Sequence, residues 1–381
     1  MTPEVIVTGA GPAGCVAAVL LARAGARVRL FDRARFPRRK LCGDTLNPGA
    51  RALLASLGLA RGLDEAGLEI QGMVVTGSGV RVLGRYPRGV TGLAITRAVL
   101  DERLLSAAAG AGVQVEEGTT ITAPVVATAG HRERVVGVQL AGHGSRQIAR
   151  GALCVAADGR HSALAFRLGL SRHPAWPRRW AIGAYYADVD DVGGGFGEMH
   201  IRDGYYIGVA RVPGGLVNAC LVTADRARLR DPEAALRAAV STDPLLQERF
   251  ARARRAGPVA TLGPLAVECR AAGMPGLLVA GDAGGFVDPM TGDGLRFAIR
   301  SGELAARAAI AALDRGEAAP EVLLHRWQRE FRRKRAFNRV LRRLVDAPRS
   351  VRAAAIGARL APSLLARVIC AAGDVPEGAA A

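Results

Sequence analysis

The sequence predicts an α/β fold that begins with a strand–helix–strand unit. Three features near the start of the chain support this prediction: a β-branched run at residues 5–8, a glycine-rich turn at residues 9–14, and a second strand at residues 27–31. The chain has 381 residues, of which 50% are hydrophobic, and its mean hydropathy is +0.16. This length and composition are typical of two or three globular domains and exclude a chain that is disordered throughout.

Each part of the first unit has a physical reason. The run Val-Ile-Val-Thr at 5–8 is typical of a buried parallel strand. The alanine-, valine- and leucine-rich residues 15–23 predict a helix that Gly25 closes, and Asp32 stands at the end of the second strand. This is a complete β-α-β context for the pattern Gly-x-Gly-x-x-Gly, which predicts a dinucleotide-binding site.

The three glycines of this turn have different tasks. Gly9 permits the tight turn, Gly11 lets a diphosphate approach the backbone, and Gly14 lets the helix pack against the sheet. The positive end of the helix dipole and its free N–H groups suit the diphosphate. The Asp32 carboxylate lies where it can accept hydrogen bonds from ribose hydroxyls. The turn by itself leaves NAD and FAD open.

Three further segments narrow the choice. Residues 153–162 read as a strand that ends in Asp158-Gly159, followed by Ser162. Residues 276–286 read as a strand that ends in Gly281-Asp282, and an apolar helix is predicted at about 295–313. Residues 37–44 read Pro-Arg-Arg-Lys-Leu-Cys-Gly-Asp.

In this order, the four motifs resemble those of FAD-dependent oxidoreductases of the geranylgeranyl reductase and p-hydroxybenzoate hydroxylase-like superfamily. The resemblance implies a Rossmann-like three-layer FAD-binding domain, an inserted substrate domain built on an antiparallel sheet, and a helical C-terminus. The implied boundaries are 1–68, 93–168 and 258–318 for the FAD-binding domain, 69–92 and 169–257 for the substrate domain, and 319–381 for a basic helical region.

The resemblance also implies where FAD binds. The implied cofactor-binding residues are Gly9, Gly11, Ala13, Gly14, Asp32, Arg33, Cys42, Gly43, Arg97, Asp282, Gly294 and Leu295. Arg97, at the start of a helix predicted over 98–109, would reach the diphosphate or the ribitol, and Asp282 would bind the ribitol. Gly294 and Leu295 would present helix N–H groups to the N1/O2 edge of the flavin. Asp158-Gly159 would lie near the cofactor at the domain junction.

Two details favour the reductase branch of this superfamily. Ring hydroxylases carry a His after Gly-Asp-Ala and an Asn after the later glycine, where this chain has Gly284 and Arg296. A third detail favours the monooxygenase alternative instead: the lipid-cavity motif of geranylgeranyl reductases, Tyr-x-Trp-x-Phe-Pro, is matched here only at Tyr205. Tyr205 and Tyr206 are therefore candidate substrate contacts, with a plain strand position as the alternative. Cys42 is the candidate catalytic residue near the flavin, with a small buried side chain as the alternative.

The C-terminal region carries half of the excess positive charge. The chain has a net charge of +18, and residues 325–352 hold eleven Lys/Arg and two acids, a net of +9. Trp327, Phe331, Phe337, Val340, Leu341 and Leu344 recur at near-helical spacing. This pattern is typical either of a helix that binds an anionic membrane surface or of a helix that packs on the protein with a solvated basic face.

Other classes of function are not expected. Aromatic residues are 4% of the chain, too few for rows of base-stacking side chains, so nucleic acid is not an expected partner. The six cysteines are scattered without a C-x-x-C pair, which indicates neither a metal site nor a disulfide framework and fits a reducing compartment. No apolar run approaches the length of a membrane span and no signal peptide is evident. A cytoplasmic location is expected, with peripheral contact on the inner membrane face as an alternative.

The leading hypothesis is a reductase that transfers a hydride between flavin and a C=C bond of a hydrophobic prenyl- or quinone-like substrate. FAD would supply the redox chemistry, with NADPH or NADH as a candidate electron donor. One alternative is a monooxygenase that hydroxylates an aromatic or polyketide-like substrate. A second is an electron-relay flavoprotein at a membrane surface.

Overall fold

The glycine-rich start of the chain forms a strand, a tight turn and a helix. Strand β1 (Glu4–Thr8) is followed by helix α1 (Pro12–Arg23) and by strand β2 (Arg27–Asp32). The helix begins three residues earlier than the sequence predicts, because Pro12 occupies a first-turn position that needs no N–H donor. The computed structural model describes residues 4–77, 79–129, 131–141, 147–176, 178–190, 194–315, 319–346 and 362–375.

A six-stranded sheet forms the centre of the first half of the molecule. Its order is β21 (Gly273–Met274), β22 (Leu277–Val279), β12 (Leu153–Ala156), β1, β2 and β8 (Gln114–Glu117). All pairs are parallel except β21 with β22. The central strands β1, β12 and β22 are almost completely buried, which explains why they are runs of apolar residues without alternation. The outer strands β2 and β8 carry charged residues at partly exposed positions.

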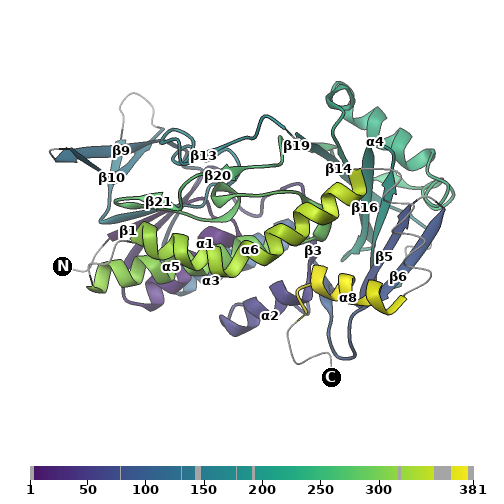
Figure 1. Cartoon of the computed structure of the whole chain (residues 1–381), viewed down its shortest axis with the longest axis horizontal. Coiled ribbons are helices and arrows are strands. Elements are labelled where there is room, and N and C mark those ends of the chain that lie inside the picture. Colours follow the sequence, from purple (N-terminus) through teal and green to yellow (C-terminus); the bar gives the residue numbers. More distant parts are fainter. Residues whose placement is uncertain are drawn as a thin grey trace.

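Helices and a small antiparallel sheet cover the two faces of this sheet. Helix α1 packs against α3 (Arg97–Gly110) and α5 (Gly294–Arg315), and α6 (Ala319–Asp346) packs along α5. The three-stranded sheet of β9 (Ile121–Ala129), β10 (Arg132–Leu140) and β11 (Gln147–Arg150) contacts β12 and β1. Figure 1 shows these layers on the left, with α5 and α6 running beneath the strands. The predicted α/β class with a Rossmann-like unit is confirmed.

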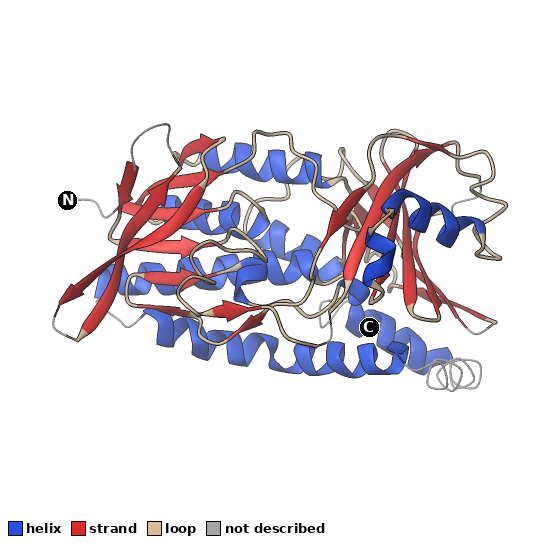
Figure 2. Cartoon of the chain, turned by 90° about the horizontal axis from the view of Figure 1, so that it is seen from above, coloured by secondary structure: helices blue, strands red, loops and turns tan. Residues whose placement is uncertain are grey.

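The second half of the molecule is an eight-stranded, mostly antiparallel sheet (Figure 2). It consists of β18 (Arg254–Arg255), β14 (Trp180–Ala187), β17 (Leu216–Thr223), β16 (Tyr205–Val212), β15 (Phe196–Arg202), β5 (Gly72–Gly77) and β6 (Val80–Arg85), with β19 (Ala260–Leu262) paired to β14. Helix α4 (Pro232–Ser241) covers one face through Leu236 and Val240. The other face points toward the first half of the molecule, which leaves it free to line a site.

Short elements join the two halves. Strands β3 (Thr45–Leu46), β7 (Gly92–Ala94) and β4 (Leu68–Ile70) form one small sheet, and β13 (Ser171–Arg172) pairs with β20 (Glu268–Cys269). The remaining elements are helix α2 (Pro48–Ser56) and the 3-10 turns η1 (Arg226–Leu229), η2 (Gly281–Gly284) and η3 (Pro289–Thr291). The last described helix, α8 (Pro362–Ala372), lies against β6.

The apolar stripe of α6 divides between the core and the surface. Trp327 and Phe331 are buried in the main core, and the Phe331 ring lies 4.9 Å from that of Phe297. Phe337 is half-buried, and Val340 is 57% exposed, so the predicted stripe does not continue into the core at Val340. The side chains of Leu341 and Leu344 and residues 347–352 of the predicted basic helix lie outside the described residues.

Candidate functional site

A cavity of about 400 Å³ lies between the two halves of the molecule. Its walls come from the glycine turn, residues 40–47, the start of α3, the turns after β12 and β22, residues 289–295, the free face of the eight-stranded sheet, and α8. These segments are far apart in the sequence. Nine predicted site residues line this one cavity: Gly11, Ala13, Cys42, Gly43, Arg97, Asp282, Gly294, Leu295 and Tyr206.

The glycine turn contains two glycines that the fold itself requires. Gly9 has a φ of +91°, and a Cβ there would lie 2.5 Å from the carbonyl oxygen of Ala157. A Cβ on Gly14 would lie 1.8 Å from the Gly9 carbonyl oxygen. Both residues lie behind the cavity wall, where they allow strand, turn and helix to pack.

Gly11 is different because the described residues leave most of the space beside it open. Its φ of −79° is open to any residue. A Cβ there would meet only a guanidinium nitrogen of Arg38, at 3.4 Å, which is an ordinary contact distance. The absence of a side chain at Gly11 therefore keeps space open in the cavity wall.

Asp32 and Arg33 lie outside the cavity wall. The Asp32 carboxylate accepts hydrogen bonds from the backbone N–H of Ala10 and Ala34, both at 2.8 Å, so it holds the glycine turn against the end of β2. Arg33 is exposed.

Cationic side chains gather around the open space at Gly11. Arg97 is buried and makes two hydrogen bonds of 2.8 and 2.7 Å to Asp101, while Arg38 lies 3.2 Å from the same carboxylate. Burial, together with the neighbouring charges of Arg97, Arg38 and Arg160, lowers the pKa of Lys40 to about 8, although Asp282 opposes the shift. Asp101 is shared by two arginines, and Arg38 also lies 3.8 Å from Asp32. The three cations Arg38, Lys40 and Arg97 thus outnumber these two carboxylates, so this end of the cavity is electropositive.

Arg160 links this cluster to Asp282. The Arg160 guanidinium lies 2.9 Å from the Asp282 carboxylate. Burial raises the pKa of Asp282, but the charges of Arg160, Lys40 and Arg97 outweigh burial and hold it below its usual value. Two buried nitrogens of the cluster, Nε of Arg38 and Nη1 of Arg160, have no hydrogen-bond partner among the described residues. Unpaired buried donors of this kind indicate a site for an anionic or polar ligand.

The turn after β12 has a mainly structural geometry. One carboxylate oxygen of Asp158 accepts a hydrogen bond from the backbone N–H of Ala163 at 2.8 Å. Gly159 and Arg160 line the cavity, whereas Asp158 does not.

A buried polar network lies directly behind Cys42. Asp44 is fully buried and accepts hydrogen bonds from the Tyr185 hydroxyl, from Asn218 Nδ2 at 2.6 Å and from the backbone N–H of Arg97 at 3.2 Å. Burial raises the pKa of Asp44 to about 6, against the lowering effect of these hydrogen bonds. Burial also raises the pKa of the Cys42 thiol. Sequence reasoning included Asp44 in a motif but missed Tyr185 and Asn218, which come from β14 and β17.

The free face of the eight-stranded sheet forms an apolar wall. Met73, Val75, Val82, Met199, Ile201 and Val222 line the cavity from this face. Tyr206 lies among them, and its hydroxyl donates a hydrogen bond of 2.7 Å to Asp288. Tyr205 does not line the cavity: it packs in the cluster under α4, on the opposite face. Adjacent strand residues point to opposite faces, so only one of the two tyrosines can reach the site.

The comparisons with known proteins agree with this geometry. Residues 2–191 match the family model of the FAD binding domain. The chain is 31% identical to a menaquinone reductase of Mycolicibacterium smegmatis over 353 residues, which cover 86% of this chain and 82% of that one. It is 28% identical to a digeranylgeranylglycerophospholipid reductase of Methanopyrus kandleri, with coverages of 86% and 87%.

The chain belongs to the family of FAD-dependent oxidoreductases that includes these reductases. A solved structure of the flavin-dependent brominase Bmp2 superposes with a TM-score of 0.83 at 22% identity and covers 98% of this chain and 94% of its own. At that identity the likeness shows the shared fold. The predicted family and cofactor are confirmed.

The residues of this FAD-dependent oxidoreductase fit the cofactor. The open space at Gly11 lies beside Arg38, as a diphosphate requires. Two buried guanidinium nitrogens, one on Arg38 and one on Arg160 in the cavity wall, have no acceptor among the described residues. The start of α5 lines the same cavity through Gly294 and Leu295, so a helix N-terminus is available to an anionic group. Where ring hydroxylases carry Asn, Arg296 instead binds Glu330 on α6 and Asp374 after α8.

Proposed function

We propose that this enzyme reduces a C=C bond or a quinone ring in a hydrophobic prenyl- or quinone-like substrate. One observation carries the proposal: the apolar wall of the eight-stranded sheet and the electropositive end at Gly11 belong to one continuous cavity. An apolar molecule in such a cavity would lie beside the cofactor with most of its surface removed from water. The names of the relatives, which act on menaquinone and on a geranylgeranyl phospholipid, support the same class.

We assign the cofactor-binding roles as follows. Gly11 and Ala13 leave room for the diphosphate, while Arg38, Lys40 and Arg97 balance its charge. Asp282 binds the ribitol, and Gly294 and Leu295 present backbone N–H groups to the flavin N1/O2 edge. Asp32 and Arg33 serve the adenosine end. Bound FAD supplies hydride transfer.

Cys42 and Asp44 are the groups that we assign to proton handling. Because burial raises the pKa of the Cys42 thiol, its Sγ keeps a proton at neutral pH. Asp44, with a pKa of about 6, lies behind it and is connected through Tyr185 toward the surface, since Tyr185 is only half-buried. Tyr206, fixed by Asp288, limits the space beside the substrate.

The test is turnover by the FAD-loaded enzyme with NADPH or NADH and menaquinone, with and without oxygen. A reductase consumes the nicotinamide and reduces the quinone in the absence of oxygen. A strict requirement for oxygen and a hydroxylated product would replace this proposal with the monooxygenase. Flavin reduction and reoxidation without any modified small molecule would replace it with an electron relay.

We also propose the domain organisation. Residues 1–68, 93–168 and 258–318 would form the FAD-binding domain, and residues 69–92 and 169–257 the substrate domain. The separate six-stranded and eight-stranded sheets support this division. Helix α8 lies against β6, so the C-terminal region contributes to the site as well as to the basic surface.

Peripheral membrane contact through α6 is the last part of the proposal. The outward stripe of this helix exposes Arg329, Arg332, Arg333 and Arg339, together with Leu324 (41% exposed) and Val340 (57% exposed). Cations that flank apolar side chains suit an anionic bilayer, where prenyl lipids reside. Within the described residues, no helix is both long enough and apolar enough to cross a bilayer.

Vesicle sedimentation tests this contact. The wild-type protein should bind phosphatidylglycerol vesicles and not phosphatidylcholine vesicles, and binding should weaken with salt. The double variant R329Q/R333Q should lose binding, whereas the matched control R226Q/R230Q, which removes two exposed arginines near α4, should keep it. Equal loss in both variants would indicate a non-specific charge effect and refute the role of α6.

A further inference from the structure

Helix α8 forms part of the cavity wall, a role that its sequence did not indicate. Val368, Ile369 and Ala372 line the cavity, as does Gly373 just after the helix. Figure 1 shows α8 below β5 and β6, on the side of the eight-stranded sheet, whereas α1 lies under the six-stranded sheet. The helix therefore bounds the part of the cavity assigned to the substrate.

The contact surface of α8 is specific, because three glycines make room for it. A Cβ on Gly84 of β6 would lie 1.8 Å from the Cδ1 of Ile369. A Cβ on Gly373 would lie 2.7 Å from the ring of Tyr86, and one on Gly49 would lie 2.5 Å from Asp374. Each of these glycines leaves space that an α8 or neighbouring side chain fills, as expected for a fixed docking position.

Lys334 fixes the C-terminal end of α8. Its Nζ donates hydrogen bonds to the carbonyl oxygens of Ala371 (2.5 Å) and Ala372 (2.9 Å), which are among the last carbonyls of the helix. The same Nζ lies 3.2 Å from Asp374 and 3.2 Å from Asp293. A cation at this position satisfies open carbonyls and interacts favourably with the helix dipole.

Asp293 connects this anchor to the cofactor end of the cavity. It immediately precedes Gly294, which lines the cavity at the start of α5, and it accepts hydrogen bonds from Asn47 (3.0 Å) and Asn338 (3.1 Å). The position of α8 is thus set from the segment that lies beside the cofactor. Because Lys334 and Asp293 hold α8 in place, the distance between α8 and the cofactor end of the cavity is fixed.

We propose that α8 is the specificity element of this enzyme, and that Val368 and Ile369 set the length of the apolar chain that the cavity accepts. This inference rests on the proposed function, because it assumes that the apolar part of the cavity holds the substrate. Ile369 is held against Gly84 and is almost fully buried, while Val368 is half-buried. Removing carbon atoms from Ile369 extends the cavity, and adding them at Val368 shortens it.

The test measures binding to the FAD-loaded enzyme. Menadione and menaquinones with increasing numbers of prenyl units are titrated, and the dissociation constant is taken from the change in flavin absorbance. I369A should improve binding of longer chains relative to menadione by about tenfold, and V368F should weaken it by about tenfold, since one methylene in an apolar pocket changes affinity by at least that factor. Menadione itself should bind equally to all variants.

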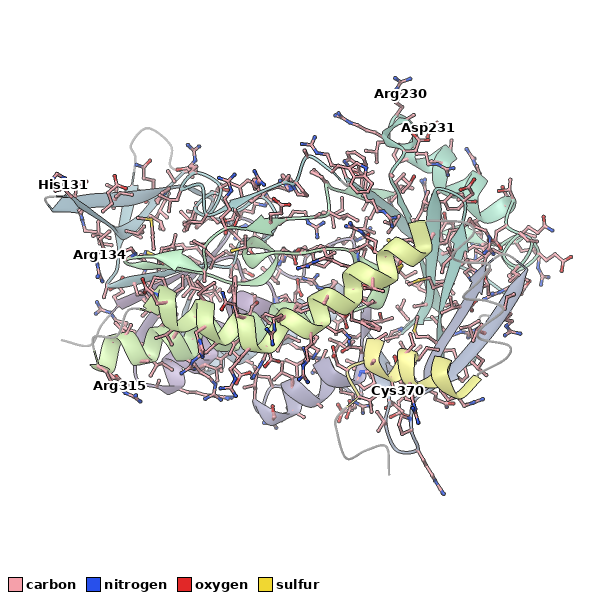
Figure 3. All side chains as sticks on the ribbon, viewed as in Figure 1. His131, Arg134, Arg230, Asp231, Arg315 and Cys370 are labelled. Atoms are coloured by element: carbon pink, nitrogen blue, oxygen red, sulfur yellow. The ribbon has the colours of Figure 1, made fainter. Side chains whose placement is uncertain are left out.

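The matched control is C370A. Cys370 is the next residue of α8 and does not line the cavity; Figure 3 labels it on this helix. This variant should leave the chain-length profile unchanged. A profile that is the same for I369A, V368F and wild type, with FAD bound, overturns the proposal.

A second ligand series separates this proposal from the proposed function. Linear alkanols of increasing length are titrated in the same way. If prenyl quinones fail to bind while alkanols bind up to a length limit that I369A shifts, the proposed substrate class is wrong and the role of α8 stands. If neither series binds, the proposed substrate class and the role of α8 are both wrong. A further variant tests the anchor of α8. K334M should raise the rate of Cys370 alkylation several-fold and flatten the chain-length profile, whereas R230M, at an exposed position that does not line the cavity, should change neither.

Discussion

Replacing Gly11 separates the requirements of the cofactor from those of the fold. Among the described residues, one Arg38 nitrogen lies within 4 Å of the position that a Cβ on Gly11 would take, at 3.4 Å, and the φ of Gly11, −79°, suits any residue. G11V should therefore fold normally. The added side chain occupies the space assigned to the diphosphate, so it should block FAD binding.

The size of the effect follows from these contacts. Losing the close approach of a diphosphate to the backbone removes charge-assisted hydrogen bonds, each worth about 1.5–3 kcal/mol. The loss of two of them corresponds to a roughly hundredfold or greater increase in the dissociation constant of FAD. G14A should instead destabilise the fold, because its Cβ would lie 1.8 Å from the Gly9 carbonyl oxygen. We expect it to lower the free energy of unfolding by about 1–3 kcal/mol or more.

Two assays distinguish these outcomes. Urea unfolding of the apoprotein measures fold stability, and titration of the apoprotein with FAD, followed by flavin fluorescence, measures binding. G11V should match wild type in the first and fail in the second. If G11V binds FAD as tightly as wild type does, the glycine turn does not hold the diphosphate. If G11V cannot fold, the space beside Gly11 is not open to a side chain.

Three further predictions concern charged groups in the cavity wall or directly behind it. The pKa of Lys40 is about 8, and the negative charge of bound FAD should raise it, so FAD affinity should fall by up to tenfold per pH unit above about pH 8. K40M should abolish this dependence in calorimetric titrations. The pKa of Asp44 is raised from 3.8 to about 6, so the folded protein binds this proton more tightly than the unfolded chain does. The free energy of unfolding should therefore fall as pH rises from about 4 to about 6, and D44N should flatten that slope in urea unfolding. D282A should weaken FAD binding roughly tenfold or more in the same titrations and leave Arg160 without its 2.9 Å partner; unchanged affinity would exclude Asp282 as a ribitol ligand.

The local parts of the site could be predicted from the sequence because each depends on neighbouring residues. The order strand, glycine turn and helix at 4–23 follows from β-branched residues, glycines and an alanine-rich stretch. The structure adds that Gly9 and Gly14 act inside the fold, whereas Gly11 borders the cavity. That distinction depends on the Ala157 carbonyl and on Arg38, which the turn sequence does not contain.

The face of a strand could not be predicted where both faces are buried. Strand β16 is apolar on both sides, because α4 covers one face and the cavity borders the other. Alternation therefore gives no signal that separates Tyr205 from Tyr206. The tertiary structure assigns Tyr206 to the cavity and Tyr205 to the core under α4.

The sequence by itself determined the α/β class, the family and the FAD cofactor, because glycine turns, strand ends and helix starts are local patterns that a nucleotide ligand constrains. Only the tertiary structure decided which side chains share a cavity. Lys40, Arg160 and Asp282 converge, and α8 docks beside β6 through Lys334, across hundreds of residues of sequence. Such contacts depend on burial and charge balance between distant segments, and no periodicity within a single segment records them.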